Sequence, residues 1–210
     1  MNTARKNRIY NINECIVFAK TNEPFGGLSN MASGYPLFIN DNIIPSSEAL
    51  YQAMRYSLFP HIQHEIISQH SPMMAKMISK KYHTYTRQDW EDIKIKVMRW
   101  ALQVKLSQHW TKFSALLDAT GNKPIVEYST KDKVWGATKI SDTQLSGVNA
   151  LGRLLMELRE NYVRANQHIE CVTPPSNVAG FRLYDHDIDM VCNEDFFLNN
   201  PDEEREMEFV

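Results

Sequence analysis

The sequence has few cysteines, and they form no recognisable motif. Its 210 residues include three, Cys15, Cys171 and Cys192. An odd number without Cys-x-x-Cys spacing argues against a disulfide framework and against a zinc site. Long hydrophobic runs are also missing, because no segment approaches the roughly 20 consecutive apolar residues of a membrane-spanning helix. No apolar core of a secretory signal follows the basic N-terminus. We therefore expect a cytoplasmic protein without a membrane partner.

The motifs typical of cofactor-dependent enzymes are absent as well. The chain contains no Walker loop, no G-x-G-x-x-G turn, no zinc signature and no serine-hydrolase elbow. Its seven histidines show no pair spaced for metal binding together with carboxylates, and the near pair His61 and His64 lacks a third ligand. We expect neither a metal nor a cofactor.

The net charge of -2 is small but unevenly distributed. Residues 1–170 carry 21 Lys and Arg against 15 Asp and Glu, whereas residues 171–210 carry 2 against 10. A basic body suits a protein that handles phosphates, although an ordinary surface with a solvated tail has the same pattern. With Pro174-Pro175 as a boundary signal, we predict one domain over 1–170 and an acidic extension over 171–210. The extension is expected to be partly docked, through Phe181, Tyr184, Phe196 and Phe197, or disordered, above all from Asp202 to Glu208.

The hydrophobic pattern predicts a mainly helical α+β fold with a few short strands near the N-terminus. With 43% hydrophobic and 23% charged residues, the composition is that of a globular protein. Alternation around Asn40-Asp41-Asn42 predicts a hairpin over residues 36–44. Helix starts are expected at Ser46-Ser47-Glu48 and at Ser71-Pro72.

Three further helical patterns complete the expected fold. A capping box at Thr86-Arg87-Gln88-Asp89 predicts the start of a long helix, with Trp90, Ile93, Val97, Ala101 and Val104 on its buried stripe. The last body helix is predicted from about Gly147 to Arg164. Met73, Met74 and Met77 have the spacing of a helical core face.

Polar and aromatic residues gather beside these helix starts and tight turns in six segments. They are Phe18-Ala19-Lys20, Pro24-Phe25-Gly26-Gly27-Leu28-Ser29-Asn30, Ser47-Glu48-Ala49-Leu50-Tyr51-Gln52-Ala53, Trp90, Glu127-Tyr128-Ser129 through Asp132 to Trp135-Gly136, and Gly147-Val148-Asn149-Ala150-Leu151-Gly152. In this order they resemble the YbiA/NADAR family of NAD- and ADP-ribose-associated proteins, over roughly residues 16–162. The resemblance implies a compact, mainly helical domain that cleaves N-glycosidic bonds. YbiA-type members act on early riboflavin-pathway intermediates, and NADAR-type members remove ADP-ribose from guanine bases.

The resemblance implies that Glu48 is catalytic, and Asp132, three residues before Trp135-Gly136, is the second catalytic candidate. Cleavage of a ribosyl–nitrogen bond passes through an oxocarbenium-like sugar, which requires a nearby anion and a group that transfers protons. Glu48 shares a helix face with Tyr51, Gln52 and Arg55, although a capping glutamate on a solvated stripe has the same spacing. Asp132 is equally consistent with an ordinary turn. If both carboxylates face one pocket, their repulsion divides the acid and base roles between them.

The third catalytic residue implied by the resemblance is Lys20. NADAR-type members resemble one another in a lysine after this aromatic strand, which YbiA-type members need not have. Desolvated against aromatic walls, such a lysine becomes a nucleophile that attacks the opened sugar as a Schiff base, or it orients ribose hydroxyls or a phosphate. An exposed lysine at a strand end is the simpler interpretation.

The other expected site residues would bind the ADP-ribose moiety. Phe25-Gly26-Gly27 allows close backbone approach and positive φ angles, and the residues from Ser146 to Asn149 start a helix whose N–H groups suit an anion. Trp90 and Trp135 would hold a purine between them. Each also has an ordinary interpretation, as a turn, a cap or core. The expected binding set is Phe25, Gly26, Gly27, Ser29, Asn30, Tyr51, Gln52, Trp90, Trp135, Gly136, Gly147 and Asn149.

The sequence thus predicts a hydrolase that removes ADP-ribose from guanine bases in DNA, with ADP-ribosylated DNA as its partner. Lys20 and the basic body favour this substrate. The alternatives are an N-glycosidase of riboflavin-pathway intermediates and a non-catalytic ADP-ribose or NAD-binding module, while an interaction protein is supported only by the extension. If the acidic extension covers the site, deletion of residues 175–210 should raise the activity. The oligomeric state is left open.

Overall fold

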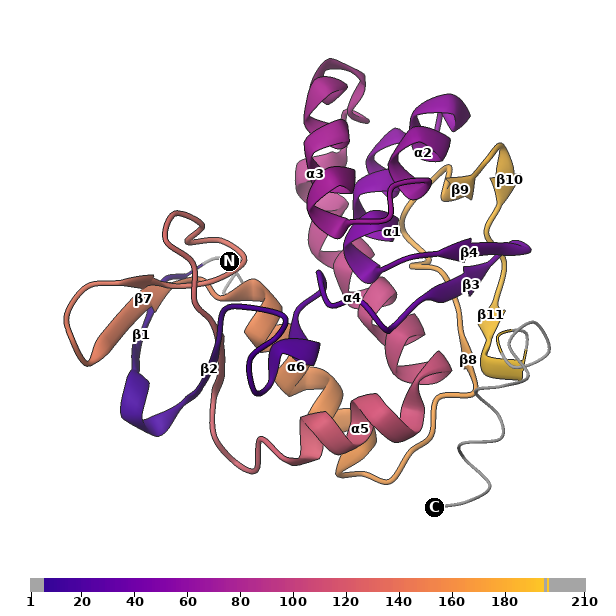
Figure 1. Ribbon diagram of the computed structural model, residues 1–210. Coiled ribbons are helices and arrows are strands. Elements are labelled where there is room, and N and C mark those ends of the chain that lie inside the picture. Colours follow the sequence, from indigo (N-terminus) through magenta and orange to yellow (C-terminus); the bar gives the residue numbers. More distant parts are fainter. Residues whose placement is uncertain (1–5, 195, 197–210) are drawn as a thin grey trace. The chain divides into compact units, whose positions relative to one another are not determined.

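The structure, a computed structural model, describes residues 6–194 and 196 (Figure 1). It divides the chain into two units, the first formed by residues 1–29 and 112–167 and the second by residues 30–111 and 168–210. Each unit is therefore built from two separate segments of the chain. Within the described part, no helix is long and apolar enough to cross a membrane.

Short strands form the frame of the first unit. β1 (Arg8–Asn11) pairs antiparallel with β7 (Gln144–Gly147), which also pairs with β6 (Thr138–Lys139). β2 (Ile16–Phe18) and β5 (Ile125–Glu127) pair in parallel, an arrangement that requires a long connection between the strands. The 3-10 turn η2 (Ile12–Glu14) lies between β1 and β2, and the 3-10 turn η3 (Gly26–Leu28) follows β2. The core here contains Tyr10, Val126, Ala137 and Leu145.

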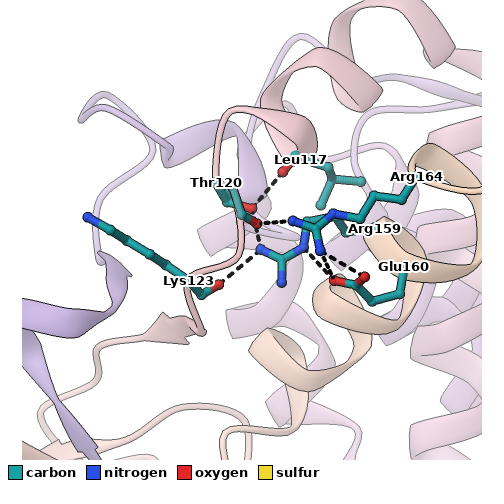
Figure 2. Close-up of polar contacts among 7 residues, drawn as sticks. Leu117, Thr120, Lys123, Arg159, Glu160 and Arg164 are labelled. Atoms are coloured by element: carbon teal, nitrogen blue, oxygen red, sulfur yellow. Dashed lines mark hydrogen bonds and ion pairs between the residues drawn. The ribbon is translucent and has the colours of Figure 1, made fainter.

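The last helix of the first unit ends in a buried arginine. α6 (Ala150–Leu158) packs on β5 and continues as the π-helix η6 (Arg159–Val163). The Arg159 guanidinium donates to Thr120 Oγ1 at 2.6 Å and to the Lys123 carbonyl at 2.9 Å, and it pairs with Glu160 at 3.0 Å (Figure 2). These charge-assisted bonds tie the turn after α5 (Trp110–Asp118) to the end of α6.

The second unit is mainly helical. α1 (Ser47–Ala53) packs against α2 (Pro60–Ile67), α3 (Pro72–Lys81) and α4 (Trp90–Gln108), and the four helices stand together in Figure 1. The 3-10 turns η4 (Met54–Tyr56) and η5 (His83–Tyr85) follow α1 and α3. The stripe predicted for α4 is buried throughout: Trp90, Ile93, Val97, Ala101 and Val104.

The predicted hairpin and the first two predicted helix starts are confirmed. β3 (Leu37–Ile39) pairs antiparallel with β4 (Asn42–Ile44), and Asn40 and Asp41 between them both have positive φ, as a tight two-residue hairpin turn requires. Ser46 caps α1, since its hydroxyl accepts from the Ala49 N–H at 3.2 Å. Pro72 occupies the first turn of α3. The mixed α+β class is confirmed, although strands are not confined to the N-terminal region.

Three expectations about the helices α3, α4 and α6 are corrected. The residue before α4 is Asp89, whose carboxylate pairs with Arg87 at 2.6 Å and makes no capping hydrogen bond, so the capping box at Thr86 does not form. The last helix begins at Ala150 rather than at Gly147. The methionine face was assigned wrongly, because α3 buries Ala75, Ile78 and Ser79 and leaves Met73, Met74 and Met77 exposed.

The segment after residue 167 is built into the second unit. β8 (Cys171–Val172) pairs with β11 (Val191–Cys192), and β9 (Arg182–Leu183) pairs with β10 (His186–Asp187). Phe181 packs edge-on against Trp100 with 4.8 Å between ring centroids, and Gln63 of α2 donates to the Arg182 carbonyl at 2.9 Å. Tyr184 is half-buried, and Phe196 packs against His109. Phe197 and the run from Asp202 to Glu208 lie outside the described residues, and the domain boundary at residue 170 stays a prediction.

Two of the three cysteines form a disulfide, contrary to the expectation from their odd number. Cys171 and Cys192 are bonded, because the register of β8 and β11 places them directly opposite each other. Cys15 is a free thiol, and burial, with a smaller contribution from Glu14, raises its pKa.

Candidate active site

The second unit holds a buried glutamate at the first turn of α1. Glu48 is 2% exposed, and its backbone N–H donates to the Asn30 carbonyl at 2.9 Å. The Ser46 cap starts the helix two residues earlier, and the Glu48 side chain leaves the first turn beside Asn30 and Gln52. The solvated capping glutamate considered from the sequence is therefore excluded.

Two side-chain amides hold the Glu48 carboxylate. Gln52 donates from Nε2 to Oε1 at 2.8 Å, and Asn30 donates from Nδ2 to Oε2. Burial raises the pKa of Glu48, opposed by the charge of Lys76, by the Gln52 hydrogen bond and by the charge of Arg55. A carboxyl whose pKa is raised in this way is suited to taking up and releasing a proton.

The network continues from Gln52 into α3 and η4. The Gln52 carbonyl oxygen accepts from Ser79 Oγ at 2.6 Å and from Arg55 Nη1 at 3.2 Å. The Tyr56 hydroxyl lies 2.5 Å from the Ser79 carbonyl oxygen, to which it donates. Glu48, Gln52, Tyr56 and Ser79 are all buried.

Tyr51 and Trp90 form an aromatic pair in the same unit. Their ring centroids lie 4.9 Å apart, and the Arg55 guanidinium carbon lies 5.2 Å from the Trp90 ring centroid. Arg55 thus connects the aromatic pair with the Glu48 network. Trp90 itself is 3% exposed, so its indole ring is part of the core. Its contact with a purine stays a prediction.

In the first unit, Asp132 closes a turn. Its Oδ1 accepts from the N–H groups of Val134 and Trp135 at 2.8 and 2.9 Å, and its own N–H donates to Ser129 Oγ at 2.9 Å. This is the turn role that the sequence allowed. No described residue donates to Asp132 Oδ2, and the side chain is half-buried. A catalytic role for Asp132 stays a prediction.

The expected anion site at the start of α6 is corrected, because protein carbonyls already use its donors. The N–H groups of residues 148–151 donate to the carbonyls of residues 133–136 at 2.7 to 3.1 Å. Asn149, in the left-handed conformation, donates from Nδ2 to the Ile125 carbonyl and accepts from the Glu127 N–H. Gly147 and Gly136 permit this close packing, since a Cβ on Gly147 would lie 2.3 Å from the Gly136 carbonyl oxygen.

Lys20 lies in the turn that follows β2. Its side chain is 74% exposed and its ammonium lies 3.6 Å from Glu23, so the structure shows no aromatic desolvation of this amine within the first unit. The positive φ expected for the glycines occurs at Phe25, while Gly26 is required by close approach to the Lys20 and Thr21 carbonyls. Gly27 and Ser29 take part in the same turn, in which the Ser29 N–H donates to the Gly26 carbonyl. A nucleophilic role for Lys20 stays a prediction.

The structure thus brings Asn30, Glu48 and Gln52 into one hydrogen-bonded group and adds Arg55 and Ser79 to it. The convergence of Lys20 and Asp132 on Glu48 stays a prediction, since they belong to the other unit. Ser79 was missed from the sequence. The signal for Ser79 is its position on the buried stripe of α3, beside Ala75 and Ile78. From the sequence alone, the methionines are expected on that stripe instead.

Among the described residues, no group of three or more His, Cys, Asp or Glu side chains could hold a metal ion. A buried carboxyl with fixed partners and a raised pKa is typical of enzymes that transfer protons.

Comparison with known proteins identifies the family. The NADAR domain model matches residues 17–162. N-glycosidase YbiA from Escherichia coli K12 is 37% identical over 145 residues, which cover 69% of this chain and 86% of that protein. The NMR structure of E. coli YbiA matches with a TM-score of 0.61 and 32% identity over 79% of this chain and 96% of that one. The chain belongs to the NADAR family.

Another relative carries a different name. The riboflavin biosynthesis protein VVA0006 from Vibrio vulnificus is 31% identical over 176 residues, covering 80% of this chain and 46% of that protein. Together with YbiA, the relatives confirm the enzyme class expected from the sequence, a glycosidase that cleaves N-glycosidic bonds. Its substrate is a separate question.

Proposed function

We propose that this chain is an N-glycosidase that removes ADP-ribose from ADP-ribosylated guanine bases in DNA. The observation that carries the catalytic part is the environment of Glu48, a buried carboxyl whose two oxygens accept from Gln52 and Asn30 and whose pKa is raised by burial. Such a group can hold a negative charge near a sugar and still take up a proton.

The proposed reaction is a hydrolysis. The oxygen of a water molecule forms a bond to the anomeric carbon of the ribose while the bond from that carbon to the guanine nitrogen breaks. Glu48 accepts a proton from the water, and the electron pair of the broken bond goes to guanine, which takes a proton from solvent. The ionised carboxyl stabilises the positive charge that develops on the sugar in the transition state.

Two features of the sequence support DNA as the substrate. Residues 1–170 carry an excess of Lys and Arg, which favours binding to the phosphates of nucleic acid. Lys20 occupies the position at which NADAR-type members have a lysine, and its exposed side chain is accessible to an incoming ligand.

A second candidate is hydrolysis of an early riboflavin-pathway intermediate. It is favoured by the names of relatives, among them the riboflavin biosynthesis proteins of Vibrio vulnificus and, over 77 residues at 44% identity, of Arabidopsis thaliana. The same carboxyl would serve this reaction, because it too breaks a ribosyl–nitrogen bond.

The test offers both substrates to the same protein. An oligonucleotide that carries ADP-ribosylated guanine and a ribosyl pyrimidine of the flavin pathway are each incubated with wild type and with Glu48→Gln. Mass spectrometry follows the release of ADP-ribose from the oligonucleotide and of the free pyrimidine from the second substrate. The matched control is Glu91→Gln, which changes a first-turn glutamate of α4 whose side chain is 72% exposed.

We expect ADP-ribose release from the oligonucleotide by wild type and by Glu91→Gln. Glu48→Gln should lose about a hundredfold or more in kcat, equivalent to roughly 3 kcal/mol of transition-state stabilisation. Turnover of the pyrimidine alone would select the second candidate. Tight binding of ADP-ribose without turnover of either substrate would reject both in favour of a binding module.

A further inference from the structure

The hydrogen bonds around Gln52 have a fixed direction. Arg55 is always protonated and can only donate, so the Gln52 atom 3.2 Å from its Nη1 must be the amide oxygen. The amide nitrogen of Gln52 then faces Glu48 Oε1. The orientation of this amide is therefore set by chemistry and needs no knowledge of hydrogen positions.

Ser79 reinforces the same orientation. A carbonyl oxygen only accepts, so the Tyr56 hydroxyl uses its one hydrogen on the Ser79 carbonyl, 2.5 Å away. Ser79 Oγ lies 2.6 Å from Gln52 Oε1 but 3.1 Å from the Tyr56 hydroxyl, so its hydrogen goes to the nearer acceptor, Gln52 Oε1. Two donors, Arg55 and Ser79, thus hold the Gln52 oxygen away from Glu48.

The two oxygens of Glu48 are therefore not equivalent. Oε1 faces an N–H group that cannot turn away, so a proton on Oε1 would oppose the Gln52 hydrogen. Oε2 faces the Asn30 amide, whose side chain has Glu48 as its only hydrogen-bond partner among the described residues. Rotation of the Asn30 amide by half a turn would present its oxygen to a proton on Oε2.

The charged groups that act on Glu48 lie on two elements. Lys76 on α3 and Arg55 in η4 are the charged groups that act on the carboxyl. The other elements packed on α1, namely α2, α4 and β4, contribute no charged group that acts on it among the described residues. Both cations favour the ionised form of the carboxyl.

We propose that Ser79 and Gln52 are positioning residues that fix the Glu48 carboxyl so that Oε2 takes up and releases the proton, with Asn30 turning to follow it. The catalytic part of this inference rests on the proposed function. The assignment of the proton to Oε2 does not, since it concerns the titration of Glu48 in the protein alone.

The first experiment uses wild type without substrate. The side-chain amide signals of Asn30 and Gln52 are assigned by ¹⁵N NMR through the variants Asn30→Asp and Gln52→Glu, and are followed as Glu48 titrates. We expect the Asn30 amide signals to move further than those of Gln52, because only Asn30 exchanges a donated for an accepted hydrogen bond. Equal movement, or larger movement of Gln52, would overturn the assignment even if the enzyme acts on another substrate.

The second experiment measures the pH dependence of kcat on whichever substrate wild type turns over. Ser79→Ala should lower kcat by about tenfold, leave KM unchanged and move the acidic limb of the profile, while Ser79→Thr, which keeps the hydroxyl, restores it. The control is Ser107→Ala, which removes a buried α4 hydroxyl that donates to the Glu170 carbonyl at 3.2 Å. An unchanged profile in Ser79→Ala, or the same shift in Ser107→Ala, would refute the positioning role. If Ser79→Ala does not fold, the wild-type titration still decides.

Discussion

Glu48→Gln should make the folded protein more stable at neutral pH. Because burial raises the pKa of Glu48, the native state holds this proton more tightly than the unfolded chain, whose glutamate has a pKa of about 4.3. Below that value both states are protonated and Glu48 carries no penalty. As the pH rises through the interval between the two pKa values, the wild type loses free energy of unfolding relative to the variant.

The size of the effect on the free energy of unfolding follows from the single proton that Glu48 binds. Over that interval the difference in free energy of unfolding between Glu48→Gln and wild type should grow by up to about 1.4 kcal/mol for each pH unit, and then level off at the native pKa. The variant keeps the network, since its amide oxygen can accept from Gln52 and its nitrogen can donate to a turned Asn30. Other titrating groups are common to both proteins and cancel in the difference.

The assay is urea unfolding of wild type, Glu48→Gln and the surface control Glu91→Gln from pH 4 to pH 8. Glu91→Gln should give a nearly constant difference, because its side chain is 72% exposed. A difference for Glu48→Gln that stays flat, or that falls as the pH rises, would refute the conclusion that burial dominates at this carboxyl.

Two further predictions concern stability. Replacing Cys171 and Cys192 together by serine should lower the free energy of unfolding by about 3 kcal/mol, which is the loop-closure value for a sequence separation of 21 residues. This prediction is wrong if the double variant and the oxidised wild type have the same free energy of unfolding in urea. Gly26→Ala should cost about 1–3 kcal/mol, because its Cβ would lie 2.4 Å from the Thr21 carbonyl oxygen. A thermal melt of Gly26→Ala that is unchanged, compared with Gly121→Asn at an open position of positive φ, would show that this turn adapts at no cost.

The predictions that succeeded depend on neighbours in the sequence. The turn at Asn40-Asp41, the cap at Ser46 and the stripe of α4 are each set within a few residues, by side chains that favour positive φ, bond to a free N–H or repeat at helical spacing. The spacing of Glu48 and Gln52 on one helix face agrees with their hydrogen bond, while the catalytic role of Glu48 stays a prediction.

The failures depend on distant partners. Cys171 and Cys192 meet through the register of two two-residue strands, which composition does not reveal. Ser79 reaches Gln52 across 27 residues of chain. The N–H groups at the start of α6 donate to the carbonyls of residues 133–136, and nothing near them in the sequence shows that these carbonyls occupy the expected anion site. In each case the sequence shows which groups are present, and the tertiary pairing decides how they are used.

The contacts of the C-terminal segment decide which deletion can test whether its acidic residues affect activity. A deletion that starts at residue 175 would remove β9, β10 and β11 and the partners of Trp100 and Gln63. Shortening the chain after Phe196 removes the acidic run from Asp202 to Glu208 and keeps those contacts. If the acidic run competes with DNA, this shorter deletion should raise the rate on the modified oligonucleotide, and an equal rate would end that hypothesis.

Because each unit is formed by two separate segments of the chain, the two units differ in how early they can fold during translation. β1 and β2 emerge first, yet their partners β7 and β5 are made more than a hundred residues later. Those N-terminal strands have unpaired edges until their partners are made, while α1 to α4, whose neighbours follow directly in the chain, can already assemble. Nascent chains stalled near residue 110 should therefore expose the first strands to proteases or chaperones, and release of the full chain should protect them.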